Sequence, residues 1–148
     1  MRNEKLSLPY RYLFHFTKKQ NTNLMSKRVN IMKNQIEHQS FEFAVRTVNL
    51  YKYLTSSHQE FDLFRQFLRS GTSIGANVSE AQKAQSYADF SSKMYIALKE
   101  ANETQYWLRL FHRIGYLSDT EYSSIKADID SIISLLMAIT KSTNPQKR

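Results

Sequence analysis

The four histidines are the side chains best suited to metal binding or acid–base catalysis, and their spacing argues against both. A di-iron site in a helical bundle uses Glu-x-x-His pairs, which bring both ligands to one face of a helix. The His-Glu-x-x-His pattern of helical zinc sites does not occur, and a chain without cysteine offers no thiolate ligand. The sequence therefore predicts no metal site and no cofactor. The residues three positions before the histidines include no carboxylate: they are Tyr12, Gln35, Thr55 and Arg109.

Arginine–histidine pairs are a second pattern that could carry chemistry, because some helical ribonucleases use one. The two nearest pairs, Arg11 with His15 and Arg109 with His112, are more closely spaced than that element requires. General acid–base work also needs a titratable group placed beside a nucleophile or a substrate, and no such motif stands out in this chain. We therefore predict no catalytic residues, no small-molecule substrate and a protein that is not an enzyme.

Positive charge is concentrated at the N-terminus. The net charge is +8, and residues 1–33 hold eight basic groups against one acid, which leaves the remaining 115 residues nearly neutral at +1. This segment shows no clear helical periodicity, and Met25 and Met32 are alternative starts, so it is either a basic arm or a mis-called start. We expect residues 1–33 to be poorly ordered, residues 34–143 to form a four-helix bundle, and residues 144–148 to be a tail.

Several features of the composition favour a cytoplasmic protein. No apolar run is long enough to cross a membrane, so we expect no membrane association. The N-terminus lacks the pattern of a secretory signal. The absence of cysteine suits a reducing compartment.

Apolar residues at helical spacing predict four helices, in a chain that holds only two prolines and three glycines. The first is expected to begin near Ser40 and the second near His58. Ser86 is a predicted N-cap for the third, and Ser118 opens a capping box for the fourth. Short loops make neighbouring helices antiparallel, so the fold class is all-α, an antiparallel up-down-up-down four-helix bundle. The predicted buried stripe of the first helix consists of Phe41, Ala44, Val45, Val48 and Tyr51.

Two glycines, Gly71 and Gly75, lie inside the predicted second helix. Each should cost about 1 kcal/mol relative to alanine, so either the helix breaks here or another backbone approaches closely. The apolar register continues from Phe64 to Val78 across both glycines, which favours close approach. A phosphate-binding loop would need a different glycine spacing after a strand.

The segment around these glycines, residues 67–81, resembles the central motif of the 23S rRNA intervening-sequence proteins, a bacterial family of four-helix bundle proteins. Ser73-Ile74, Ala76-Asn77 and Glu80 match that motif, while Gly75 stands where the family usually has proline and Ala81 where it usually has glycine. Residues 97–108 resemble the family's third helix. The resemblance extends over roughly residues 34–139.

The resemblance implies an antiparallel bundle that assembles as a homopentamer. Some members are encoded inside insertions in 23S rRNA genes. The accessory variability determinant of diversity-generating retroelements is similar, and it is a basic pentamer that binds a reverse transcriptase and nucleic acid. Our leading hypothesis is a non-enzymatic oligomeric binding protein that associates with RNA or with a nucleic-acid enzyme. The alternative is a protein–protein interaction scaffold with no nucleic-acid role.

Three groups of residues are candidates for these roles. The polar residues of the family motif are expected to be structural, with Asn77 and Glu80 buried and satisfied by the third helix, and Glu100 in a salt bridge rather than a catalytic pair. The candidate nucleic-acid-binding residues are Arg65, Arg69, Lys93, Arg109 and Arg113. The candidate structural polar residues are Ser73, Asn77, Glu80, Glu100 and Thr104. The candidate oligomer interface consists of Tyr95, Tyr106 and Trp107.

Overall fold

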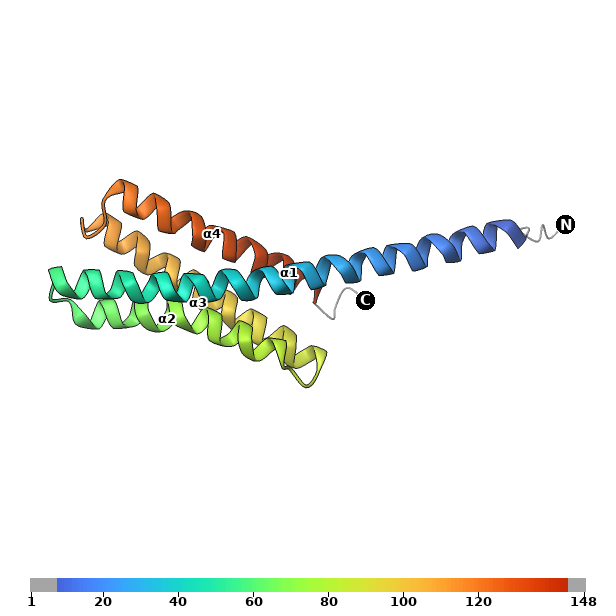
Figure 1. Cartoon of the computed structure of the whole chain (residues 1–148), viewed down its shortest axis with the longest axis horizontal. Coiled ribbons are helices and arrows are strands. Elements are labelled where there is room, and N and C mark those ends of the chain that lie inside the picture. The colour runs from blue at the N-terminus through green and yellow to red at the C-terminus, as the bar shows by residue number, and fades with distance from the viewer. Residues whose placement is uncertain (1–7, 144–148) are drawn as a thin grey trace, which may run out of the picture. The chain divides into compact units, whose positions relative to one another are not determined.

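The computed structural model describes residues 8–143, so the predicted tail at 144–148 lies outside the described residues. Within that range there are four helices and no strand (Figure 1). The all-α fold class is confirmed, and the short loops fit the predicted up-down-up-down order. Among the described helices, none combines the length and the apolar character that crossing a membrane requires. The helices are α1 (Leu8–Ser57), α2 (Phe61–Gln82), α3 (Tyr87–Arg113) and α4 (Asp119–Ser142).

Helix α1 is much longer than predicted. It begins at Leu8 and not near Ser40, so the predicted start was wrong. No glycine or proline follows Pro9 until the second helix, and proline is tolerated in the first turn of a helix, so nothing local stops the helix from extending. The chain divides into two compact units between Ile31 and Met32, and α1 contributes to both. The expectation that residues 1–33 are poorly ordered stays a prediction.

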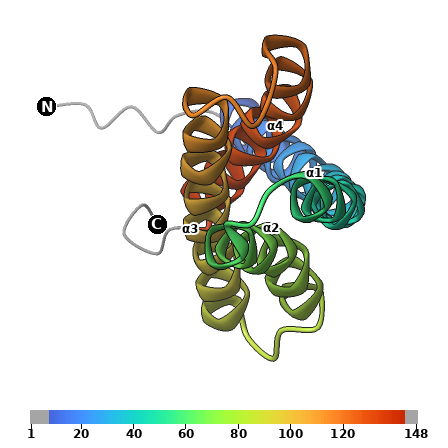
Figure 2. The same ribbon diagram turned by 90° about the vertical axis from the view of Figure 1, so that its left-hand side faces the viewer.

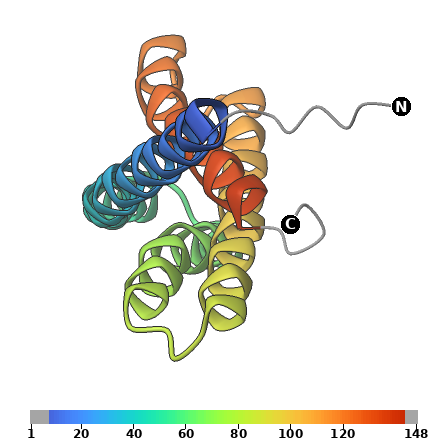
Figure 3. The same cartoon turned by 90° about the vertical axis from the view of Figure 1, so that its right-hand side faces the viewer.

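The second unit, residues 32–148, contains the hydrophobic core. Views along the helices show α1 and α3 on opposite sides of this unit, with α2 and α4 between them (Figures 2 and 3). Three fully buried phenylalanines, Phe64, Phe67 and Phe111, join α2 to α3 through edge-to-face ring contacts. Core residues from α1 include Ile36, Phe43 and Leu54, and isoleucines of α4 complete the interior. All four helices therefore enclose one core.

The glycines of α2 mark the place where α1 and α2 pack most closely. Helix α2 continues without a break through both glycines, as predicted. A Cβ atom on Gly71 would lie 2.6 Å from Thr47 Cγ2, and one on Gly75 would lie 3.2 Å from the carbonyl oxygen of Ser40. Thr47 and Ser40 are themselves buried. The predicted close approach is confirmed, and the partner is α1.

The predicted N-termini of α3 and α4 are confirmed. Ser86 Oγ accepts a hydrogen bond from the backbone N–H of Asp89, which caps α3. Gly115, just beyond the end of α3, has a φ of 83°, a left-handed conformation that favours glycine. Ser118 and Glu121 form the reciprocal capping box of α4. These local signals fix where the α3–α4 loop begins and ends.

The capping box predicts an acid-sensitive contribution to stability. Glu121 Oε2 accepts hydrogen bonds from the backbone N–H and from the hydroxyl of Ser118, each at 2.8 Å. These bonds, the backbone one first, lower the pKa of Glu121 below its usual 4.5. A carboxyl with a lowered pKa stabilises the fold above its unfolded pKa, and that contribution is lost as the pH falls through the folded pKa. We expect Glu121→Gln to lower the melting temperature at about pH 6, and the difference from the unsubstituted protein to shrink towards about pH 2.5. A difference that stays constant over that range would contradict this.

Candidate functional site

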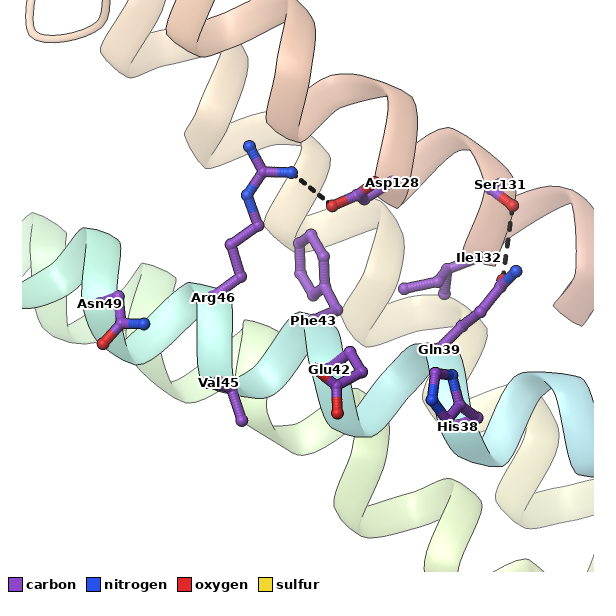
Figure 4. Close-up of a pocket in the computed structure, with 10 residues that line it drawn as sticks. All are labelled: His38, Gln39, Glu42, Phe43, Val45, Arg46, Asn49, Asp128, Ser131 and Ile132. Carbon is purple, nitrogen blue, oxygen red and sulfur yellow. Dashed lines mark hydrogen bonds and ion pairs between the residues drawn. The ribbon is translucent and has the colours of Figure 1, made fainter.

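A groove lies between α1 and α4 on the described surface. It has a volume of about 430 Å³, which is within the range of small-molecule pockets (Figure 4). Its floor is apolar, formed by Phe43 and Ile132, which are almost fully buried. Its rim is polar: it consists of His38, Gln39, Glu42, Arg46, Asn49, Asp128 and Ser131, with Val45 completing the lining.

Arg46 bridges this groove from α1 to α4. Its guanidinium donates to Asp128 Oδ2 at 2.5 Å and to Ser124 Oγ at 2.7 Å. Beyond it lies a second hollow of about 370 Å³, which Arg46 and Asn49 also line. At the first hollow Ser131 Oγ donates to Gln39 Oε1. The bridging polar groups are thus engaged with one another, and their main effect is to hold α1 against α4.

The arrangement closest to an acid–base pair lies at the α3–α4 end. His112 Nε2 is 2.7 Å from Asp119 Oδ1, and the imidazole stacks on Tyr122 with ring centroids 4.2 Å apart. None of the serine and threonine hydroxyls that the structure describes is hydrogen-bonded to a histidine, so the pair lacks the neighbouring nucleophile of a catalytic triad. Nor do three potential metal ligands come together among the side chains that the structure describes. The pair joins the end of α3 to the start of α4.

A second histidine stacks at the same end of the bundle. The ring of His58 lies 3.9 Å from that of Tyr116. A hydrogen bond with Tyr116 lowers the pKa of Glu60, and the same bond raises the pKa of Tyr116. These contacts connect the α1–α2 loop to the α3–α4 loop.

The structure separates the five candidate nucleic-acid-binding residues. Lys93 is ion-paired with Glu80. Arg65 Nη1 lies 3.5 Å from Asp62 Oδ1. Burial raises the pKa of the Glu100 carboxyl, and Arg69 is near enough to oppose that rise. These three basic side chains therefore lie near acidic groups of the same chain, as is ordinary for surface charges.

The other two candidates, Arg109 and Arg113, remain together. They are exposed, lie one turn apart on α3, and form no ion pair among the described residues. They are the part of the predicted basic surface that the bundle leaves open to a ligand.

The family-motif residues Asn77 and Glu80 do not occupy the environment that we predicted. Asn77 is half-buried and donates to Ser73 O within its own helix, at 2.9 Å. Glu80 is exposed and ion-paired with Lys93 of α3. The prediction of a buried amide and a buried carboxylate was therefore wrong, although Glu80 does interact with α3. Sequence spacing showed that the two residues lie close together on α2, but not how far their face is turned from the core.

Thr104 supplies the buried polar link between α2 and α3. Its hydroxyl is 3.0 Å from Ser70 Oγ, and both residues are buried. Glu100, one turn earlier, is half-buried. Burial raises the pKa of the Glu100 carboxyl, Glu103 raises it further, and Arg69 and Lys99 oppose these effects. No ion pair of Glu100 occurs among the described residues, so the predicted salt bridge was wrong.

The candidate interface residues of α3 lie partly on its outer surface. Tyr95 and Tyr106 are exposed, while Trp107 is half-buried and packs against the core. The rings of Tyr106 and Trp107 meet edge to face at 5.0 Å, and Trp107 Nε1 donates to Glu103 Oε1. The sequence prediction did not include Ile96 of α3 and Ile114, the C-cap residue that follows α3, which are also exposed. Their spacing of eighteen residues, about five turns, could have identified them.

The predicted buried stripe of α1 was wrong in its main members. Phe41 is 66% exposed and Val45 is 45% exposed. The helix instead buries Ile36, Ser40, Phe43, Thr47 and Leu54. Small polar residues occupy this inner face because the α2 glycines pack there, and the more apolar stripe is left on the outside.

Comparison with known proteins identifies the family. The model of the 23S rRNA-intervening sequence protein family matches residues 32–138. A crystal structure of a protein with unknown function from the S23 ribosomal protein family of Bacteroides thetaiotaomicron is 54% identical, with a TM-score of 0.72, over 74% of this chain and 98% of that chain. No curated protein matches the sequence. The chain belongs to the 23S rRNA-intervening sequence protein family.

Proposed function

We propose that this protein is a non-enzymatic, cytoplasmic, oligomeric binding protein, with a pentamer as the expected assembly, that associates with RNA or with an RNA-processing partner. The observation that carries the proposal is the family match over residues 32–138, together with a 54% identical relative from the S23 ribosomal protein family. Both family names refer to ribosomal components.

Arg109 and Arg113 are the proposed contact to RNA on the bundle. Neighbouring arginines on one helical face can neutralise successive phosphates, and an oligomer repeats the pair in every copy. Phosphate contacts release counterions, so affinity that depends on them falls steeply as salt is added. The basic residues of the N-terminal segment are a second source of such contacts.

The test is binding of a 23S rRNA fragment by the full chain across a salt series. We expect affinity to fall by more than about tenfold between about 50 mM and about 200 mM salt. Arg109→Glu combined with Arg113→Glu should weaken binding and flatten the salt dependence. The matched control, Lys83→Glu with Lys141→Glu, makes the same change in net charge at exposed lysines outside α3. Equal losses in both pairs would show a general charge effect and no site on α3.

A protein–protein scaffold without a nucleic-acid role is the second candidate function. The observation that favours it is the number of large apolar side chains left exposed on α1 and α3, among them Phe41 and Tyr106. Contacts made by such groups depend weakly on salt. Absence of RNA binding by the full chain at low salt would favour this candidate.

A further inference from the structure

Helix α3 presents an apolar surface to the outside of the bundle. We define the outer face of α3 by Tyr95, Ile96, Tyr106 and Ile114, each at least 39% exposed. Tyr95 and Tyr106 are eleven residues apart, about three turns, so they lie on the same side of the helix. This side is opposite the one that buries Met94, Ala101 and Leu108. Large apolar side chains gathered on one exposed face are typical of an interaction surface.

Helix α1 presents a second apolar surface. We define the outer face of α1 by Phe41 and Val45, which are exposed, and by Val48, which is half-buried. These residues follow the i, i+4, i+7 spacing of a single stripe. Val45 points away from α4, whereas Arg46 and Gln39 reach towards it (Figure 4). The stripe therefore has the pattern of a buried helix face but no partner helix in this bundle.

The two outer faces lie on opposite sides of the bundle, since α1 and α3 are diagonal to each other (Figure 2). One neighbour cannot cover both faces. A second copy of the chain could cover these faces in two ways. Like faces could meet, α1 with α1 and α3 with α3. Alternatively, the α1 face of one copy could meet the α3 face of the next. The second arrangement is head to tail and builds a ring or a filament.

Charge favours the head-to-tail arrangement. Two acids, Glu37 and Glu42, lie within about one turn of Phe41, while two basic residues, Lys99 and Arg113, each lie about two turns from Tyr106 on the same side of α3. Contact between like faces would place charges of the same sign together, whereas α1 against α3 would place opposite charges together. Each face also holds one residue of the opposite charge: Lys52 in the outer face of α1 and Glu103 in the outer face of α3. The carboxylate of Glu103 already accepts the indole N–H of Trp107.

We propose that the outer face of α1 in one copy packs against the outer face of α3 in the next, with Phe41 and Tyr106 near the centre of the contact. This pairing rests on the proposed oligomeric function and specifies how the copies meet. It places Arg113 at the subunit contact, so assembly and RNA binding would compete for that side chain, while Arg109 stays available to RNA. It accounts for an apolar stripe on α1 that does not face its own core. Aromatic residues surrounded by charges of complementary sign have the composition of a protein interface.

The test uses two full-length variants, each of which lacks one face. Phe41→Asp removes the α1 face and Tyr106→Asp removes the α3 face; both residues are at least half exposed, so the bundle should still fold. Each variant alone should have the 17.4 kDa mass of one chain by light scattering. An equimolar mixture should form a complex of two chains. The intact α3 face of the Phe41→Asp variant meets the intact α1 face of the Tyr106→Asp variant, and the complex grows no further because neither chain has a second intact face.

The control is Met137→Asp, which places the same charge at a 57% exposed apolar residue of α4 and should leave the assembly unchanged. If either variant loses its helical circular dichroism, Val45→Asp or Ile96→Asp replaces it. Dimers formed by each variant alone would overturn the pairing in favour of contacts between like faces. An assembly that both substitutions leave intact would overturn the pairing but leave the proposed oligomer standing. A single-chain mass for the unsubstituted protein would overturn both.

Discussion

Phe111→Ala is expected to lower the free energy of unfolding by about 3–5 kcal/mol. Phe111 is fully buried, and its ring meets those of Phe64 and Phe67 edge to face, with centroids 5.5 Å and 5.6 Å away. The substitution leaves a cavity where α2 and α3 join and removes both aromatic contacts. Domains of this size are stable by about 5–15 kcal/mol, so the loss should be a large part of the total.

The measurement is chemical denaturation followed by circular dichroism, at one fixed protein concentration because assembly adds to apparent stability. Phe61→Ala is the matched control, since it makes the same change at a side chain of α2 that is 44% exposed. We expect the control to cost less than about 1 kcal/mol. A similar loss in the two variants would contradict the position assigned to Phe111 in the core.

Gly71→Leu is expected to destabilise the bundle by about 3 kcal/mol or more. Even the first side-chain atom would lie 2.6 Å from Cγ2 and 2.7 Å from Oγ1 of Thr47. Thr47 is fully buried, and its hydroxyl donates to Phe43 O, so it has little room to move aside. Leucine favours the helix more than glycine by only about 1 kcal/mol, which cannot offset separation of α1 from α2.

Ala76→Leu is the control for this substitution, because it introduces the same side chain at an exposed position of α2. We expect it to leave the denaturation midpoint nearly unchanged. Gly71→Ala should be milder than Gly71→Leu, and Thr47→Ala combined with it should recover part of the loss, because both of the closest atoms are removed. A soluble Gly71→Leu variant of unchanged stability would exclude close packing of α1 on α2.

Features encoded within a few residues could be predicted from the sequence. The N-caps at Ser86 and Ser118 depend on local hydrogen bonds, so the residue types alone indicate them. The glycine pair in α2 was also informative, because two glycines within a continuous apolar register need a packing explanation. These signals were sufficient for the fold class and for the N-termini of α3 and α4.

The orientation of α1 could not be predicted in the same way. Its most apolar stripe, which includes Phe41 and Val45, is exposed, and its inner face holds the small polar residues Ser40 and Thr47. Periodicity shows that a helix has an apolar face but not whether that face meets the chain's own core or another molecule. Only the position of Gly71 opposite Thr47 in three dimensions decides the question.

The same limit applies to the candidate site residues. The pairing of Lys93 with Glu80 and that of Ser70 with Thr104 join different helices, so they depend on helix register, which sequence spacing does not fix. Arg109 and Arg113 stayed together because they are one turn apart on a single helix. Relations along one helix could thus be predicted, whereas relations between helices required the structure.

The most direct measurement of the central claim, an oligomeric binding protein, is the molar mass of the full chain in solution by light scattering. We expect a multiple of 17.4 kDa, fivefold for the pentamer, that falls to one chain with Phe41→Asp and is unchanged by Met137→Asp. A mass of one chain for the unsubstituted protein at micromolar concentration would contradict it.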